Sequence, residues 1–247
     1  MSIQSKRDFQ GLREAGRVVR RMLKAMEAAV HAGVTTAEIN AVGAAILVQE
    51  GARSAPMLVY GFPAETLISV NDEVVHGIPS DRIIETGDLV KLDVTVEKDG
   101  YMADAAVTVA VPPTSEVKLA LMACAQHAFT KALAAARSGN RVYEIGRAVE
   151  REVKRSGFTV VAGLSGHGIG RSIHEKPSVP NEYDRRARQR LREGLVITIE
   201  PMITSGSHIA RQTDDGWTVK TADGAPSAHY EHTLVITNGA PILLTAA

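Results

Sequence analysis

Two stretches of this sequence, one in each half, share one pattern: GDLVKLD at residues 87–93 and GLVITIE at residues 194–200. Each runs from a glycine through an apolar, β-prone segment to a carboxylate, Asp93 in the first and Glu200 in the second. Each also follows a histidine that stands beside a glycine, His76 in VHGIP and His167 in GHGIG. An acid at the apolar end of a strand is costly to bury unpaired, so two such acids brought together favour a cation between them.

The segments before these strands are duplicated as well. GVTTAEIN at 33–40 and GNRVYEIG at 139–146 share their Gly, Glu and Ile at an offset of 106 residues, and Gly51 and Gly157 keep that offset. A glycine just past a helical pattern is typical of a helix end. Each half therefore predicts a long helix, a turn, a second helix ended by glycine, and then strands. The long helices are expected at roughly 6–31 and 115–137.

This internal repeat predicts an α/β (α+β) fold with two pseudo-symmetric halves, roughly 1–114 and 115–247. Because the halves supply matching acids, we expect one domain over residues 1–247 rather than two independent domains. Two copies with so long a period indicate duplication, not a solenoid.

Composition limits the kinds of partner. Lys plus Arg and Asp plus Glu both number 28, which gives no electrostatic reason to bind nucleic acid or an anionic membrane. The only cysteine, Cys124, fits a helical apolar pattern and is expected to be a core residue. The sequence shows neither an apolar N-terminal segment nor a run long enough to span a membrane, and a cytoplasmic protein is predicted.

The first acid-bearing strand continues into a predicted β-hairpin. Residues 89–96 read LVKLDVTV, and DG at residues 99–100 is a strong signal for a two-residue hairpin turn. With that turn Asp93 opposes Ala106, and Asp104 lies diagonal to Asp93 on the same face of the sheet. Two carboxylates so placed can converge on one cation or share two.

The second half repeats the arrangement. Glu200 ends the run LVITI, and Glu231 stands in YEHTLVI. By the symmetry of the repeat, Glu200 corresponds to Asp93 and Glu231 to Asp104. Four buried carboxylates with a histidine call for two divalent ions, and such ligands suit Mn, Fe, Co or Zn better than a thiolate-selected metal.

The histidines fall into two groups. An isolated histidine is more often a hydrogen-bonded structural residue than a ligand. His76, His167 and His174 stand beside glycines or acids in corresponding regions of the two halves, which favours roles in a site. The remaining histidines of the second half are expected to be structural: His208, His229 and His232.

Six motifs together carry a family resemblance: HGIP at 76–79, Asp93 with Asp104 eleven residues later, GHGIGR at 166–171, HE at 174–175, IEPM at 199–202 and YEHT at 230–233. In these motifs the sequence resembles the bacterial type I methionine aminopeptidases over nearly its whole length. The resemblance implies a pita-bread fold, in which a curved, mostly antiparallel sheet is flanked by two pairs of helices.

The resemblance also implies a ligand set. Asp93 and Asp104 would hold one divalent ion, His167 and Glu200 the other, and Asp104 and Glu231 would bridge them; the metals of the family are of the Co, Mn, Fe(II), Zn or Ni class. His76 and His174 would contact the substrate. A monovalent cation is expected on backbone oxygens at three further positions: Asn71, Glu73 and Ser227.

The substrate pocket is where this sequence departs from the family pattern. Phe62 and Trp217 stand where pocket aromatics are expected. Ile173 replaces an aromatic residue, Leu67 a cysteine and Val59 a tyrosine. The resemblance therefore implies an apolar pocket that is less aromatic than usual.

The implied function is removal of the initiator methionine from nascent polypeptides, with a preference for a small second residue. A hydroxide bridging the two ions would attack the scissile carbonyl, and Glu200 would pass a proton to the leaving amine. His174 would stabilise the oxyanion and His76 would position the scissile amide. A monomer that meets the ribosome only transiently is expected.

Two alternatives remain open. Another pita-bread peptidase, such as a prolidase or a proline-specific aminopeptidase, usually carries a large additional N-terminal domain. A metal-free binding protein with this fold, acting at ribosomes or on RNA, is expected to lose the site acids and gain basic patches.

Overall fold

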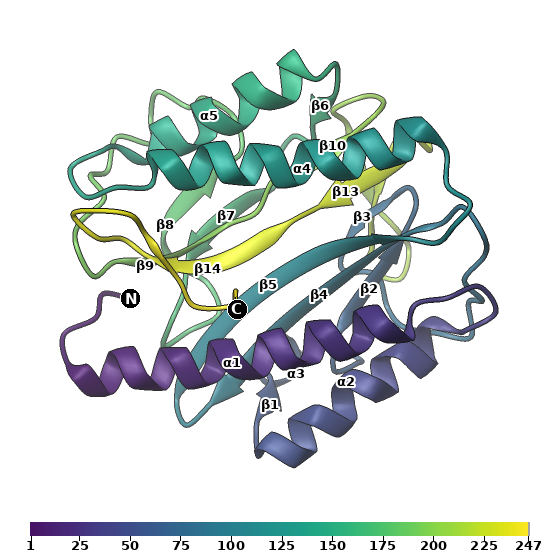
Figure 1. Cartoon of the computed structure of the whole chain (residues 1–247), viewed down its shortest axis with the longest axis horizontal. Helices are drawn as coiled ribbons and strands as arrows, with labels where there is room; N and C mark the ends of the chain where they lie inside the picture. The colour runs from purple at the N-terminus through teal and green to yellow at the C-terminus, as the bar shows by residue number, and fades with distance from the viewer. Residues whose placement is uncertain (247) are drawn as a thin grey trace.

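The computed structural model describes residues 1–246 and contains one pair of long helices in each half (Figure 1). The first pair is α1 (Lys6–Ala29) and α2 (Thr36–Glu50), and the second is α4 (Glu116–Ala135) and α5 (Val142–Arg155). Both long helices end two residues earlier than predicted. A short helix, α3 (Ala55–Tyr60), follows the first pair.

Local sequence explains where these helices begin and end. Ser5 caps α1 by accepting a hydrogen bond from the backbone N–H of Asp8. Thr35 and Glu38 form a capping box at the start of α2. Gly51 ends α2 in the left-handed conformation, with φ of 59°, as the sequence predicts.

A nine-stranded sheet lies between the helix pairs in Figure 1, and all its strand pairs are antiparallel. Its main path runs β1-β4-β5-β14-β9-β7-β8, while β2 pairs with β4 and β15 with β14. The strands are β1 (Arg53–Ser54), β2 (Leu67–Val70), β4 (Leu89–Lys98), β5 (Tyr101–Ala110), β7 (Ser165–Gly168), β8 (Glu175–Pro180), β9 (Val196–Ile199), β14 (Glu231–Val235) and β15 (Ile242–Leu243).

Two three-stranded sheets complete the described fold. One has the order β13-β10-β6 and the other β11-β12-β3. Their strands are β3 (Glu73–Val75), β6 (Thr159–Val160), β10 (Met202–Thr204), β11 (Ala210–Gln212), β12 (Val219–Thr221) and β13 (Ser227–His229).

Side-chain alternation separates the core from the site. Leu92 and Val94 of β4 face the core cluster formed with α1 and α2, so Asp93 between them points to the opposite face of the sheet. The second helix pair covers its own cluster, which includes Phe129 and Ile197. The helices thus cover one face of the central sheet, and the acids lie on the other face.

The hairpin of β4 and β5 has the predicted register. Asp99 and Gly100 form its turn with φ of 51° and 81°, and Asp93 pairs with Ala106. Ala106 also pairs with Glu231 of β14, so that acids from the two halves flank one small residue. Because this pairing joins the halves through one sheet, we propose that they form a single domain. No helix in residues 1–246 is long and apolar enough to cross a membrane.

Candidate active site

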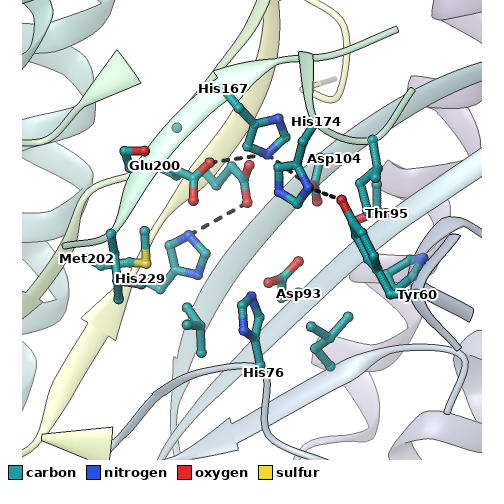
Figure 2. A pocket seen from close by; sticks show the side chains of 18 of the residues that line it. Tyr60, His76, Asp93, Thr95, Asp104, His167, His174, Glu200, Met202 and His229 are labelled. Atoms are coloured by element: carbon teal, nitrogen blue, oxygen red, sulfur yellow. Dashed lines mark hydrogen bonds and ion pairs between the residues drawn. The ribbon is translucent and has the colours of Figure 1, made fainter. Parts of the chain in front are cut away.

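A cavity of about 610 Å³ opens on the acid-bearing face of the sheet and is lined by residues of both halves. Figure 2 shows Asp93, Asp104, His167 and Glu200 pointing toward one another inside it. The predicted acids and His167 are thus brought together, although they come from β4, β5, β7, β14 and the residue after β9.

Three of the carboxylates are positioned by the sheet itself. Asp93, Ala106 and Glu231 are directly paired across β4, β5 and β14, which points their side chains to the same face. Asp104 is two residues before Ala106 and shares that face. The methyl group of Ala106 leaves the space between the acids free.

Thr198 ties the remaining two predicted ligands together. Its hydroxyl donates to Glu200 Oε1 at 2.6 Å and accepts from the backbone N–H of His167 at 3.0 Å. Nδ1 of His167 lies 2.9 Å from the carbonyl oxygen of Gly168. A proton on Nδ1 donated to that carbonyl leaves Nε2, which faces the acids, with a free lone pair.

Burial strongly shifts the titration of the cluster. It raises the pKa of Asp93 to about 7 and that of Glu200 to about 8. Burial, reinforced by the neighbouring carboxylates, also raises the pKa of Asp104 and Glu231 well above the ordinary range. The same burial lowers the pKa of His167 to about 4, which keeps its imidazole neutral. These acids therefore have no cationic histidine to balance them.

Unsatisfied atoms test whether divalent ions fit here. Within residues 1–246, five buried side-chain N or O atoms lack a hydrogen-bond partner, and four of them lie in this cluster: Asp104 Oδ1, Glu231 Oε1 and both ring nitrogens of His229. Such atoms are rare in native proteins and call for an unseen partner. Ligand atoms of Asp104, His167 and Glu231 lie within 4.8 Å of one another, and so do those of Asp93, His229 and Glu231.

The spacing of these groups also fits metal ligands. Nε2 of His167 lies 3.5 Å from Oε1 of Glu200 and 3.9 Å from Oδ2 of Asp104. These distances exceed those of ordinary N–H···O hydrogen bonds. Two ligands of one ion, each about 2.0–2.2 Å from it, stand roughly 3–4 Å apart. The oxygen and imidazole donors are therefore compatible with divalent transition metals.

Two further histidines, both predicted from the sequence, line the mouth of the cavity. His76 adopts φ of 61°, a conformation uncommon outside glycine, and His174 lies across from it in Figure 2. Nδ1 of His174 is 2.5 Å from the hydroxyl of Tyr60. Burial lowers the pKa of His76 and of His174, so both rings are expected to be neutral near pH 7.

An apolar wall adjoins the histidines. Phe62 and Trp217 pack edge to face with ring centroids 5.2 Å apart, and both line the cavity with Leu67 and Ile173. Val59 differs from this part of the prediction: it is 45% exposed and is not among the cavity-lining residues of the described chain.

Val59 points away because it lies on α3, where successive residues turn by about 100° around the helix axis. Its neighbour Tyr60 lines the cavity instead and contacts His174. The two residues are adjacent in sequence, and only the rotation of this short helix decides which of them faces inward.

Sequence reasoning missed His229, which it treats as a structural histidine. Its ring is 1% exposed, lines the cavity, and has Nε2 3.6 Å from Oε2 of Glu231. Burial, reinforced by His76 and Lys91, lowers the pKa of His229 to about 3. The available signal was its place two residues before a predicted ligand acid.

Lys91 is a second feature that the sequence did not reveal. It is 1% exposed, and its Nζ donates to Asn71 O at 2.7 Å and lies 3.4 Å from Ser227 O and 3.3 Å from Ser227 Oγ. The hydroxyl of Ser227 also donates to the carbonyl oxygen of Glu73 at 3.1 Å. The ammonium thus faces oxygens that the resemblance assigns to a monovalent cation.

Comparisons with known proteins agree with this geometry. The chain is 41% identical to methionine aminopeptidase 2 of Bacillus subtilis (strain 168), over 99% of each sequence. Its fold matches the crystal structure of methionine aminopeptidase from Rickettsia prowazekii with a TM-score of 0.95 at 33% identity, and that from Thermotoga maritima with a TM-score of 0.96 at 31% identity, each over 100% of both chains. These matches confirm the predicted pita-bread fold.

Family assignment follows from the span of the match. Metallopeptidase family M24 matches residues 10–238, which include every acid and histidine of the cavity. The metal-compatible cluster on the sheet, the fold and this match agree, and the chain belongs to metallopeptidase family M24.

Proposed function

We propose that this protein removes N-terminal methionine from polypeptides in a reaction that depends on divalent metal ions. One observation carries the proposal: a buried cluster of acids with unsatisfied oxygens lines a cavity that also has an apolar wall. Relatives that match the whole chain are named methionine aminopeptidase, which gives the substrate class.

Two divalent ions are proposed, because the cluster contains two overlapping groups of ligand atoms that share Glu231. Asp93, Asp104 and Glu231 would hold one ion, while His167, Glu200, Asp104 and Glu231 would hold the other. When bound, such ions lower the pKa of a water molecule and polarise a carbonyl group.

The side chains around the ions have separate tasks. Glu200, which accepts the Thr198 hydroxyl through Oε1 at 2.6 Å, is suited to take a proton from the attacking water and pass it to the leaving amine. Tyr60 fixes the ring of His174 through Nδ1, so that Nε2 can face the oxygen that becomes negative in the transition state. His76 lies across the cavity from His174 and is assigned to position the scissile amide of the substrate.

The methionine side chain is assigned to the apolar wall. Phe62 and Trp217 offer ring surfaces to its thioether, which gains from aromatic contacts. Leu67 and Ile173 close the pocket with aliphatic surface. A small second residue is expected to be preferred, as the resemblance implies.

The cellular setting completes the proposal. The partners are the N-termini of nascent polypeptides, met by a cytoplasmic monomer during transient contact with the ribosome. At the place assigned to a monovalent cation, Nζ of Lys91 already donates to Asn71 O and lies 3.4 Å from Ser227 O.

Peptide hydrolysis tests the proposal. Metal-loaded enzyme should cleave Met-Ala-Ser with kcat/KM far above that for Met-Leu-Ser, and removal of divalent ions with a chelator should abolish the activity until ions are restored. Comparable rates on the two peptides would point to a broader aminopeptidase. Cleavage of Xaa-Pro peptides in preference to both would favour the proline-specific alternative.

A further inference from the structure

We propose that His229 is a metal ligand, holding the ion on the Asp93 side of the cluster as His167 holds the other. The inference rests on the proposed metal-dependent function. It goes beyond the ligand set expected from the sequence, in which His167 supplies the only nitrogen and Asp93 belongs to an all-oxygen site.

The backbone of His229 is fixed from the neighbouring strand. Its N–H donates to Thr108 Oγ1 at 2.9 Å, and the Thr108 hydroxyl donates back to its carbonyl oxygen at 2.8 Å. His229 ends β13 and Glu231 begins β14, with Tyr230 between the two strands. Both side chains reach the cavity, where Figure 2 shows the His229 ring pointing toward the acids.

The ring of His229 lacks the partners that a structural histidine needs. Neither Nδ1 nor Nε2 has a hydrogen-bond partner among residues 1–246, although the side chain is 1% exposed. His232, three residues later, shows the usual arrangement. Its Nδ1 is 2.8 Å from Thr245 Oγ1 and its Nε2 is 3.1 Å from the Tyr230 hydroxyl.

The distance from His229 to the acids is that of two ligands on a common ion. Nε2 lies 3.6 Å from Glu231 Oε2, beyond hydrogen-bond range. The corresponding distance from His167 to Glu200 is 3.5 Å. A ligand atom of Asp93 completes a group within 4.8 Å. The two halves of the site are therefore alike: each has one imidazole, one acid of its own and a share of Glu231.

This arrangement changes which metals the Asp93 side prefers. An all-carboxylate site suits hard ions such as Mn, whereas an added imidazole favours Co, Ni and Zn. Loss of His229 is therefore expected to weaken the binding of Zn more than that of Mn.

Nuclear magnetic resonance of histidine side chains tests the proposal without an activity assay. Metal-free protein labelled with ¹⁵N only in its eight histidines is titrated with zinc, and the ring nitrogens are followed. Two rings should acquire zinc-bound ring-nitrogen shifts by the end of the titration. One of these two signals should be missing from the His229→Gln variant.

Variants give a second readout by calorimetry. His229→Gln should weaken one of the two zinc-binding steps by about 10-fold or more, since even outer-shell partners contribute roughly 10–100-fold to metal affinity. His232→Gln is the matched control, because it removes a buried histidine outside the cavity lining, and should leave both steps unchanged.

The outcomes separate the two proposals. A single zinc-bound ring in the wild-type protein, with two zinc ions retained, would overturn the role of His229 and leave the metal-dependent function standing. The wild-type count needs no variant, so it holds even where His229→Gln fails to fold. Retention of no zinc and no shifted ring would overturn both.

Discussion

Lys91 and Asp93 are next to one another on the same face of β4, but the polar groups of their side chains have different surroundings. The amino group of Lys91 is buried, which lowers its pKa to about 7, but it faces three oxygens of Asn71 and Ser227 within 3.4 Å. The carboxylate of Asp93 faces other acids, and burial raises its pKa to about 7. Lys91 therefore has hydrogen-bond acceptors within the protein, whereas Asp93, two residues later on the same strand, faces groups of its own charge.

The difference shows how a ligand site can be read from a structure. Burial alone marks both residues as costly. Of the two, the acid cluster is the one with buried atoms that lack a partner among residues 1–246, at Asp104, Glu231 and His229. A buried charge with its own oxygen acceptors is part of the scaffold, whereas a buried cluster of like charges indicates a missing cation.

Glu231→Gln should have the largest effect, because Glu231 is shared by both groups of ligand atoms. We expect kcat/KM to fall by about 10³-fold, the rate equivalent of several kcal/mol of lost metal interaction. Calorimetry should show weaker binding of both ions.

The same variant should stabilise the metal-free protein above pH 5. The pKa of Glu231 is raised in the folded state, so folding takes up a proton and stability falls as pH rises above the unfolded value of about 4.3. Glutamine has no such dependence. A metal-free Glu231→Gln protein that urea unfolds more easily than the wild type at pH 8 would contradict this account of the cluster.

His174→Ala should have the second-largest effect on activity. Loss of one oxyanion donor lowers kcat by roughly 10²–10³-fold. Metal content, measured by elemental analysis, should stay that of the wild type because His174 is assigned to the substrate. Tyr60→Phe, which removes the contact to Nδ1, should give a smaller loss of kcat. Loss of metal from His174→Ala would show that this ring is a ligand.

Lys91→Met tests whether the contacts of Lys91 stabilise the fold independently of the acid cluster. The change leaves the oxygens of Asn71 and Ser227 without their ammonium donor, and the free energy of unfolding should fall by about 1–3 kcal/mol. Urea titration should give the same loss with and without divalent ions. Lys154→Met, at an exposed position, should change it by less than about 0.5 kcal/mol. A Lys91 effect that disappears when metal is added would place Lys91 with the acid cluster.

Ile173→Phe should have the smallest effect. It adds an aromatic surface to a pocket that contains Phe62 and Trp217, and sulfur–aromatic contacts are worth at most about 1.5 kcal/mol. The ratio of kcat/KM for methionyl over norleucyl peptides should rise by up to roughly 10-fold. An unchanged ratio would mean that the two existing aromatics decide the preference.

The fold and the carboxylates could be predicted because their signals are local and repeated. The turn at residues 99–100 fixes the register of β4 and β5, and register fixes which residues share a face. The internal repeat then relates Glu200 and Glu231 to the first pair of acids. Such information survives in a sequence because each step depends on periodicity or on a turn.

The remaining features depend on packing between distant segments. His229 lines the cavity because Thr108, on another strand, holds its backbone. Lys91 meets Ser227 across 136 positions of sequence. The rotation of α3 turns Tyr60, rather than the expected Val59, into the cavity. No turn or periodic pattern encodes these contacts, so sequence alone leaves them unresolved.

Anomalous diffraction from crystals soaked in manganese or zinc tests the central claim most directly. Data collected above and below the metal absorption edge locate the ions independently of any assumed ligand set. The account predicts two peaks that share Glu231, one beside Asp93 and the other beside His167 and Glu200. Absence of both peaks, or peaks only outside this cluster, would contradict the claim that the unsatisfied acids form a site for two divalent ions.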